Sequence, residues 1–269
     1  MPELPEVETV RRVLKDNLVG KTINNVSIRY NPIVENNDYF LENVIGKKII
    51  DMKRYGKYLI FCLDKGYILS HLRMEGKYFY LENSQMDNKH IHVIFYLSSN
   101  SILYYQDVRK FGRMEYIETD IYNNPPLSLM GPDLVLNENI DIDKLYQKIH
   151  KSNKPIKEIL LDQRVLSGLG NIYVDEVLYE SRISPLRLGH DIKMCDIDNI
   201  IKESKRILLK AIEYKGTTIK SYTSSLGVKG SYQEFLQVHT KMLCPNCKMT
   251  LNRVKINGRM TYYCANCQR

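Results

Sequence analysis

The sequence contains no tryptophan, only six cysteines, and no apolar run that approaches the ~18 residues needed to span a bilayer. Its acidic N-terminus lacks a basic stretch followed by an apolar one, which excludes a signal peptide and a transit peptide. With 14 Gly and 9 Pro among 269 residues, collagen-like and low-complexity chains are excluded as well. The composition is 43% hydrophobic and 26% charged, so we expect a soluble intracellular protein of one large domain or two modest ones.

Acidic residues are also absent from the C-terminal tail, residues 235–269, so most of the net positive charge of the chain lies in this tail. The formal net charge is +8, and the segment from Phe235 to Arg269 carries +6 of it through six Lys and Arg residues. A positive field concentrated at one end is typical of a surface that binds a polyanion. The plain alternative is a solvated basic tail without a partner.

The spacing of apolar residues predicts an α+β protein with more than one domain. A helix is expected from Pro5 to about Asn17, with Val7, Val10 and Leu14 at helical spacing. Short aromatic and β-branched runs at roughly ten-residue intervals follow it and favour a β-sandwich over a parallel sheet. They span Tyr58 to Leu63, Tyr67 to Leu72, Lys77 to Leu81, His90 to Leu97, Ile102 to Tyr105 and Arg113 to Ile117.

Proline and glycine then mark a domain boundary. The dipeptides Pro125-Pro126 and Gly131-Pro132 interrupt regular structure, and the periodicity beyond them is helical. We expect helices near residues 141–150, 154–162, 171–181 and 196–215. The polar stretch from Thr217 to Ser231 is too long for a tight connection and predicts a functional loop.

Four cysteines in the tail form the sharpest local motif. Cys244 and Cys247 make one CxxC pair, and Cys264 and Cys267 make a second pair sixteen residues later. Two such pairs supply four thiolates for one tetrahedral zinc ion, and disulfides are disfavoured in a reducing compartment. Between the pairs, Asn257-Gly258 is a strong signal for a two-residue hairpin turn. Arg259 beside this turn can reach a phosphate or a groove, although an exposed turn residue is the plain alternative.

The N-terminus carries a second motif. With Pro2 in the second position, we expect removal of the initiator Met1, which leaves a secondary amine. An α-amino group has a pKa near 8, so a useful fraction is unprotonated and able to attack an aldehyde-like carbon. Glu3 and Glu6 supply a possible acid/base pair, but Pro and Glu also make an ordinary helix start.

Two further groups are less specific. Gly168-Leu-Gly170-Asn171 permits close approach of the backbone to a ligand, with Asn171 expected to cap the following helix and its amides facing a phosphate. A turn and a cap without a ligand is the commoner meaning of such a motif. His90 and His92 occupy alternate positions on one face of a strand, and without a third ligand we favour hydrogen bonding over metal binding.

Taken together, these motifs resemble the formamidopyrimidine-DNA glycosylase family, bacterial enzymes that excise 8-oxoguanine and also have lyase activity. The resemblance runs the length of the chain. Its motifs are Pro2-Glu-Leu-Pro-Glu-Val-Glu-Thr9, Arg54-Tyr-Gly-Lys57-Tyr-Leu, His71-Leu-Arg-Met-Glu-Gly76, Asp107-Val-Arg-Lys-Phe-Gly112, Gly168-Leu-Gly-Asn-Ile-Tyr173 and the four cysteines. One departure is the short link from Val238 to Cys244, where family members commonly have a longer link that contains glycine.

The resemblance implies three domains that bind damaged duplex DNA in the cleft between the two halves. Residues 1–133 would form the catalytic β-sandwich with its leading helix, 134–234 a helix-two-turn-helix domain with a lesion loop, and 235–269 a finger around one structural Zn²⁺. It further implies a monomer of the bacterial cytosol or nucleoid, without a membrane partner.

The resemblance also assigns roles to single residues. Pro2 would attack C1′ of the damaged nucleotide and form a Schiff base, and the strand would then be cut by β,δ-elimination. The other implied catalytic residues are Glu3, Glu6, Lys57 and Arg259. The implied DNA contacts are His71, His90, Met74, Arg109, Phe111, Lys157 and Asn171, of which Met74, Arg109 and Phe111 would fill the gap that an everted base leaves. Glu75 and Lys220 would enclose the lesion.

Three alternatives stay open at this point. An endonuclease VIII-like glycosylase for oxidised pyrimidines has the same N-terminal proline and finger, but Leu4 and the trio of Met74, Arg109 and Phe111 favour the purine enzyme. A non-catalytic DNA-damage binding protein would not need Pro2. A generic zinc-ribbon protein would explain only the tail.

Overall fold

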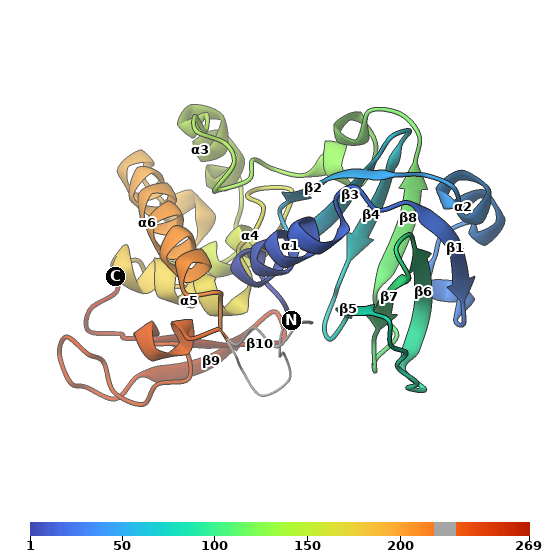
Figure 1. Cartoon of the computed structure of the whole chain (residues 1–269). Coiled ribbons are helices and arrows are strands. Elements are labelled where there is room, and N and C mark those ends of the chain that lie inside the picture. Colours follow the sequence, from blue (N-terminus) through green and yellow to red (C-terminus); the bar gives the residue numbers. More distant parts are fainter. Residues whose placement is uncertain (218–229) are drawn as a thin grey trace. The chain divides into compact units, whose positions relative to one another are not determined.

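The computed structural model of the chain describes residues 1–217 and 230–269 (Figure 1). The chain divides into two compact units, Met1–Ser128 with Lys215–Ser231, and Leu129–Tyr214 with Tyr232–Arg269. None of the helices in the described ranges is long and apolar enough to cross a membrane.

The N-terminal unit is a sandwich of two four-stranded antiparallel sheets (Figure 1). One sheet has the strand order β1-β6-β7-β5 and the other the order β2-β3-β4-β8. The strands are β1 (Ile23–Ile28), β2 (Ile49–Tyr55), β3 (Tyr58–Leu63), β4 (Tyr67–His71), β5 (Lys77–Glu82), β6 (Ile91–Leu97), β7 (Ser101–Gln106) and β8 (Arg113–Ile117). The predicted sandwich is therefore confirmed.

Side chains from both sheets meet in one apolar core, as expected for two packed sheets. Three rings lie in it: the ring centroid of Tyr78 is 5.6 Å from that of Phe61 and 5.1 Å from that of Tyr105. Helices α1 (Leu4–Leu18) and α2 (Asn37–Val44) contribute their apolar stripes to the same core. This rigid base supports the loops described below.

The second unit consists of helices and one hairpin. The helices are α3 (Ile142–His150), α4 (Ile156–Leu161), α5 (Asn171–Glu180) and α6 (Met194–Glu213), and the hairpin pairs β9 (Asn252–Ile256) with β10 (Arg259–Tyr263). Short 3₁₀ helices in the chain lie at Asn31–Ile33, Ile121–Asn123, Leu127–Leu129, Gly189–Asp191 and Tyr232–Phe235. Asn257 and Gly258 have φ of 46° and 74°, the left-handed pair that a tight hairpin turn requires.

All six predicted sandwich strands and all four predicted helices of the second unit are present, within two residues at each end. The strands β1 and β2 and the helix α2 were not predicted. Both strands lie at sheet edges, and polar residues such as Asn25 and Arg54 interrupt their alternation.

Within the described residues, the hairpin of the tail groups with the helices, and residues 215–217 and 230–231 group with the sandwich. The division into three domains that the resemblance implies stays a prediction.

Candidate active site and zinc centre

The N-terminus is held by the first turn of α1. Pro2 and Glu3 are buried, Glu3 to an exposure of 2%, whereas Met1 is exposed. Oε2 of Glu6 accepts the backbone N–H of Glu3 at 2.9 Å, which closes one half of a capping box. The chain therefore meets the helix in a fixed conformation, with Pro2 directly before it.

The other oxygen of Glu6 binds Thr217, the first residue of the loop predicted from the sequence. Oε1 accepts the backbone N–H of Thr217 at 2.7 Å and its hydroxyl at 3.1 Å. Gly216 has φ of +77°, and a Cβ there would lie 2.5 Å from this oxygen, so glycine permits the close approach. Both oxygens of Glu6 accept hydrogen bonds, which suits the supporting role that the resemblance implies for it.

A buried ion pair fixes the turn that carries Lys57. Glu8 of α1 accepts Nε of Arg54 at 3.2 Å, and Arg54 donates to the carbonyl of Gly56 at 3.0 Å. Burial by itself would raise the pKa of Glu8, but hydrogen bonds from Arg11 and the charge of Arg54 hold it below its usual value. Lys57 follows Gly56 in the turn and is only 4% exposed. The helix that orients Pro2 is thus tied to the turn of Lys57.

His71 ends β4 as a neutral ring. Burial, together with the nearby charges of Arg73 and Lys57, lowers its pKa to about 3. Nδ1 accepts the backbone N–H of Arg73 at 2.9 Å, so Nε2 carries the proton. The ring meets that of Tyr58 edge-on at 4.5 Å between centroids. At neutral pH His71 therefore offers a hydrogen-bond donor and no charge.

The two alternate histidines have different surroundings. Nε2 of His92 lies 2.8 Å from the carbonyl oxygen of Asp107 in a buried position, which confirms the expected hydrogen bonding. His90 lies just before β6 and is half-buried, and its DNA contact stays a prediction. Among residues 1–217 and 230–269, the four cysteines are the one cluster able to hold a metal.

The loop from Asp107 to Gly112 is built around a buried carboxylate. Oδ1 of Asp107 accepts the backbone N–H of Arg109 at 3.0 Å, and Oδ2 accepts those of Phe111 and Gly112 at 2.9 and 2.8 Å. These bonds satisfy amides that would otherwise lack partners inside a tight loop. The buried Asp107 carboxylate thus fixes the backbone of the exposed residues 108–111, a role that the sequence did not predict for it.

Tyr105 joins this loop to the turn at residues 72–76. A Cβ on Gly112 would lie 1.7 Å from the hydroxyl oxygen of Tyr105, and a Cβ on Gly76 would lie 2.3 Å from it. The buried phenol therefore touches the backbone of both loops, and glycine is needed at both positions. This contact brings the loop of Met74 beside the loop of Arg109.

The three residues predicted to fill the gap lie on these two loops. Met74 is half-buried on the first loop, and Phe111 is 47% exposed on the second. The guanidinium of Arg109 lies 4.7 Å from the centroid of the Phe111 ring, a cation–π contact. Glu75 is half-buried beside Met74, whereas Lys220 lies outside the described residues.

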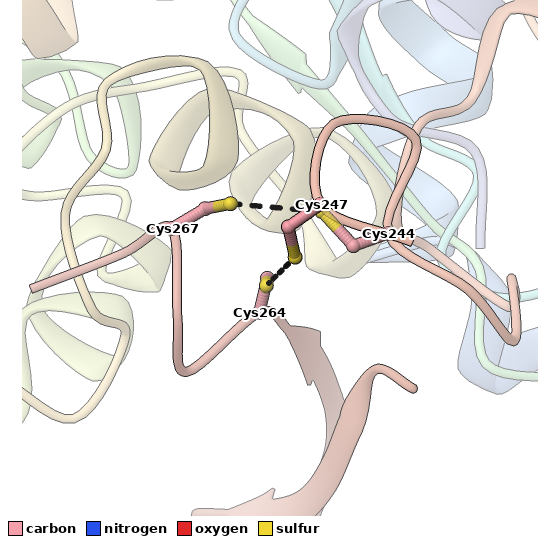
Figure 2. A group of neighbouring side chains, drawn as sticks. All are labelled: Cys244, Cys247, Cys264 and Cys267. Carbon is pink, nitrogen blue, oxygen red and sulfur yellow. Dashed lines mark hydrogen bonds between the residues drawn. The ribbon is translucent and has the colours of Figure 1, made fainter. Parts of the chain in front are cut away.

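The four cysteines of the tail converge on one point (Figure 2). Their sulfurs all lie within 4.8 Å of one another, with Cys244 and Cys267 3.8 Å apart and Cys247 and Cys264 3.4 Å apart. A tetrahedron with Zn–S bonds of about 2.3 Å has edges of about 3.8 Å, so the spacing fits zinc. All four thiols are free of disulfides. The cysteines hold one structural zinc ion, because protein fills all four positions.

Helix α5 fixes the zinc site to the helices of its unit. The hydroxyl of Tyr179 lies 3.3 Å from Sγ of Cys244. Burial opposes ionisation of Cys244, but this hydrogen bond and backbone amides lower its pKa to about 6. One turn earlier, the carboxylate of Glu176 accepts the backbone N–H groups of three consecutive residues, Gln237, Val238 and His239, at 2.6 to 3.0 Å. The short link before Cys244 is therefore docked on α5.

The side chains of Asn171 and Lys157 make contacts other than those predicted from the sequence. Asn171 is the first residue of α5, and Gly170 occupies the cap, so the expected capping by Asn171 is wrong. Its amide is engaged elsewhere and donates to the carbonyl of Met260 at 3.0 Å. Lys157 has an exposure of 0% and pairs with Asp175 at 2.7 Å, which does not support the predicted contact with DNA. Arg259 is exposed at the start of β10.

Comparison with known proteins gives the same family along the whole chain. Three family models match: the formamidopyrimidine-DNA glycosylase N-terminal domain over residues 1–114, its H2TH domain over 130–223, and the zinc finger found in FPG and IleRS over 243–269. Formamidopyrimidine-DNA glycosylase of Streptococcus mutans is 42% identical over 273 residues, which cover all of both chains. The chain belongs to the formamidopyrimidine-DNA glycosylase family.

Solved structures of family members have the same fold. A complex between wild-type Lactococcus lactis Fpg and DNA containing N7-benzyl-Fapy-dG matches with a TM-score of 0.91 and 38% identity over all of both chains. A complex of Lactococcus lactis Fpg with DNA containing an abasic site matches with a TM-score of 0.92 and 38% identity over the same extent. The curated relative from Mycoplasma genitalium is 41% identical and covers all of this chain and 96% of its own.

Sequence reasoning missed the residues that support the site of this formamidopyrimidine-DNA glycosylase family member. Asp107 and Arg54 stand at the first positions of two motifs, which was the available signal. Asp175 and Glu176 are consecutive carboxylates inside an apolar helix, which predicts buried partners. The contacts of Tyr105 with the two loops could not be predicted from the sequence, because an aromatic residue in a strand is usually an ordinary core residue.

Proposed function

We propose that this chain is a bifunctional DNA glycosylase and abasic-site lyase of base excision repair. Its substrates would be oxidised purines, 8-oxoguanine and formamidopyrimidines, in duplex DNA. The observation that carries the proposal is the buried Pro2 before α1, with Glu3 beside it and Glu6 fixing the turn. The names of the relatives and the DNA in the related structures support the same substrate class.

Removal of Met1 is the first requirement, because the nitrogen of Pro2 is otherwise an amide without nucleophilicity. The freed amine forms a bond to C1′ of the damaged nucleotide while the bond from C1′ to the base breaks, and the base leaves with a proton. Glu3 assists proton transfer at the sugar. Opening of the sugar gives an iminium on Pro2, and successive loss of the 3′ and 5′ phosphates cuts the strand.

Extrusion of the base is the second requirement, because its sugar is not accessible within the stacked duplex. Met74, Arg109 and Phe111 would fill the vacated space, with Arg109 offering donors to the unpaired cytosine. Lys57, Asn171 and Arg259 would hold the phosphates, and His71 and His90 would add hydrogen bonds to the DNA. Glu75 and Lys220 would contact the everted base.

The wider organisation follows the same proposal. Residues 1–133 would perform the chemistry, while 134–234 and 235–269 would grip the strand. The protein would act as a monomer on damaged duplex DNA in the bacterial cytosol or nucleoid. Sedimentation of the free protein and of its DNA complex measures the stoichiometry.

Borohydride trapping tests the proposal directly. Purified protein is incubated with a duplex that contains 8-oxoguanine opposite cytosine, with a dihydrouracil duplex alongside, and the adduct is mapped by peptide mass. A covalent adduct on Pro2 that prefers the 8-oxoguanine duplex is expected. Pro2→Gly should lower trapping by at least ~100-fold, since its primary amine has lost the fixed ring.

The other outcomes each point to a different function. Preference for dihydrouracil would indicate a pyrimidine glycosylase of the endonuclease VIII type. Tight binding without an adduct, in protein whose mass shows that Met1 is absent, would indicate a damage-binding protein. Full trapping in the Pro2→Gly variant would move the nucleophile elsewhere.

A further inference from the structure

The second unit contains a buried charged network that the proposed chemistry does not use. Nζ of Lys157, on α4, donates to Oδ1 of Asp175 at 2.7 Å, to Oγ1 of Thr261 at 2.9 Å and to the carbonyl of Met260 at 3.3 Å. Lys157 has an exposure of 0% and Asp175 one of 1%. Three acceptors match the three hydrogens of an ammonium group, so Lys157 is satisfied without DNA.

The second oxygen of Asp175 extends the network to the finger. Oδ2 lies 2.8 Å from Nδ1 of His239, in the link before the first cysteine, and 3.4 Å from the backbone N–H of Tyr262 on β10. A single carboxylate on α5 therefore contacts α4, the link and the hairpin. A buried ion pair whose other donors and acceptors lack partners lowers the stability of the fold. When those donors and acceptors are hydrogen-bonded, the pair instead fixes the relative positions of the elements that it joins.

The network also binds the two residues that follow Arg259, Met260 and Thr261. The carbonyl of Met260, the next residue, accepts hydrogen bonds from both Lys157 and Asn171, the latter at 3.0 Å. The hydroxyl of Thr261, which accepts from Lys157, donates to the carbonyl of Arg259 at 3.4 Å. Two bonds from Lys157 thus fix the start of β10, and one of them shares its acceptor with Asn171.

We propose that Lys157, paired with Asp175, is a positioning residue that holds Arg259, at the start of β10, in place to contact a DNA phosphate. It touches no DNA itself. This inference rests on the proposed function, since it assumes that Arg259 binds the strand. It replaces the direct contact expected for Lys157, and it explains how a finger with a short link is held in place.

A double-mutant cycle on DNA affinity tests the inference. The variants are Lys157→Met, Arg259→Ala and the two combined, measured on a duplex with an abasic-site analogue at several salt concentrations. The matched control is Lys154→Met, an exposed lysine on the same segment whose Nζ pairs with Glu158. Zinc content and melting temperature are recorded for each protein.

Each single variant is expected to weaken binding by about 10-fold, and the combined variant by no more than either alone, because Lys157 acts through Arg259. Lys154→Met should stay within about 2-fold of wild type. Multiplicative losses would overturn the inference. A salt slope that falls by about 0.9 on adding Lys157→Met to Arg259→Ala would do so too, since it indicates a direct phosphate contact. Unchanged affinity of Lys157→Met would overturn it as well.

Thr261→Val covers the case in which Lys157→Met does not fold. It leaves the ion pair intact and removes one acceptor of Lys157. A loss of about 3-fold is expected in the wild-type background, and none in Arg259→Ala. An equal loss in both backgrounds would contradict positioning through Arg259. Failure of the wild-type protein to bind or trap any damaged duplex would instead reject the proposed function.

Discussion

Each unit of the molecule presents an exposed arginine, and the two units support it by different means. Arg109 lies on a loop of the sandwich, where the buried Asp107 carboxylate binds three backbone amides. Arg259 begins the second strand of a hairpin that is held by Lys157 and by four cysteines. The first support is one side chain over an apolar core. The second is a charged network together with a metal site.

The size of the core explains the difference. The sandwich has a cluster of 26 buried apolar side chains, whereas the cluster around the finger has five, of which two are zinc ligands. A hairpin with so little apolar surface is marginal by itself and needs a metal or polar ties. A loop on a large sandwich needs only an acceptor for its amides. The three predictions below test this contrast, from the largest expected effect to the smallest.

Removal of zinc should unfold the hairpin and leave the sandwich intact. A structural zinc ion contributes on the order of 10 kcal/mol to a small finger, so chelation or Cys247→Ser should abolish the hairpin. DNA affinity should fall roughly 10³-fold, to the non-specific level. Zinc analysis, a gel-shift assay and NMR spectra of the sandwich measure the three quantities. Cys195→Ser, an exposed cysteine outside the cluster, is the control. Loss of the sandwich resonances on chelation would contradict the prediction that the sandwich folds independently of the zinc site.

Asp107→Ala should disorder the loop of Arg109 while the sandwich stays folded. Three amides lose a charged acceptor, and we expect a loss of roughly 3 kcal/mol in unfolding free energy. Excision of 8-oxoguanine should slow by about 10-fold or more, with a smaller effect on a preformed abasic site that needs no extrusion. Asp107→Asn should lie between, because it keeps one acceptor. Val108→Ala on the same loop should behave as wild type, and equal effects in both alanine variants would disprove the support by Asp107.

His71 should make the sandwich sensitive to mild acid. Its pKa is lowered to about 3 in the folded chain, against about 6.5 in the unfolded chain, so only the unfolded chain takes up the proton as pH falls between these values. Between pH 7.5 and 5.5 the wild type should lose about 1.4 kcal/mol more unfolding free energy than His71→Gln. Urea unfolding at the two values measures this difference. Identical pH dependence of the two proteins would mean that His71 titrates normally.

The sequence predicted the elements with strong local patterns. The strand Tyr58–Leu63 and the turn Asn257-Gly258 were placed correctly because apolar alternation and turn chemistry are properties of neighbouring residues. The edge strand at Ile23–Ile28 escaped, because its alternation is broken by asparagine and its pairing partner, β6, lies some 70 residues away. The resemblance of motifs supplied Pro2, Lys57 and the cysteines without any geometry.

Other features depended on contacts between distant residues. Lys157 looked like a surface lysine until Asp175, Met260 and Thr261 were seen around its ammonium group. Asn171 looked like a cap until its amide was found on Met260. The support of Arg109 by Asp107 required the closed conformation of the loop, and the contact of Tyr105 with Gly76 and Gly112 required the pairing of β7 with β5.

The sequence by itself thus determined which chemical groups this protein has: a proline at position 2, a four-thiolate zinc site and a basic tail without acidic residues. Spacing along the chain defines these groups, so they can be read from neighbouring positions. Only the tertiary structure decided which charged residues are buried supports and which remain exposed. That distinction depends on desolvation, and a side chain is desolvated by residues far from it in sequence.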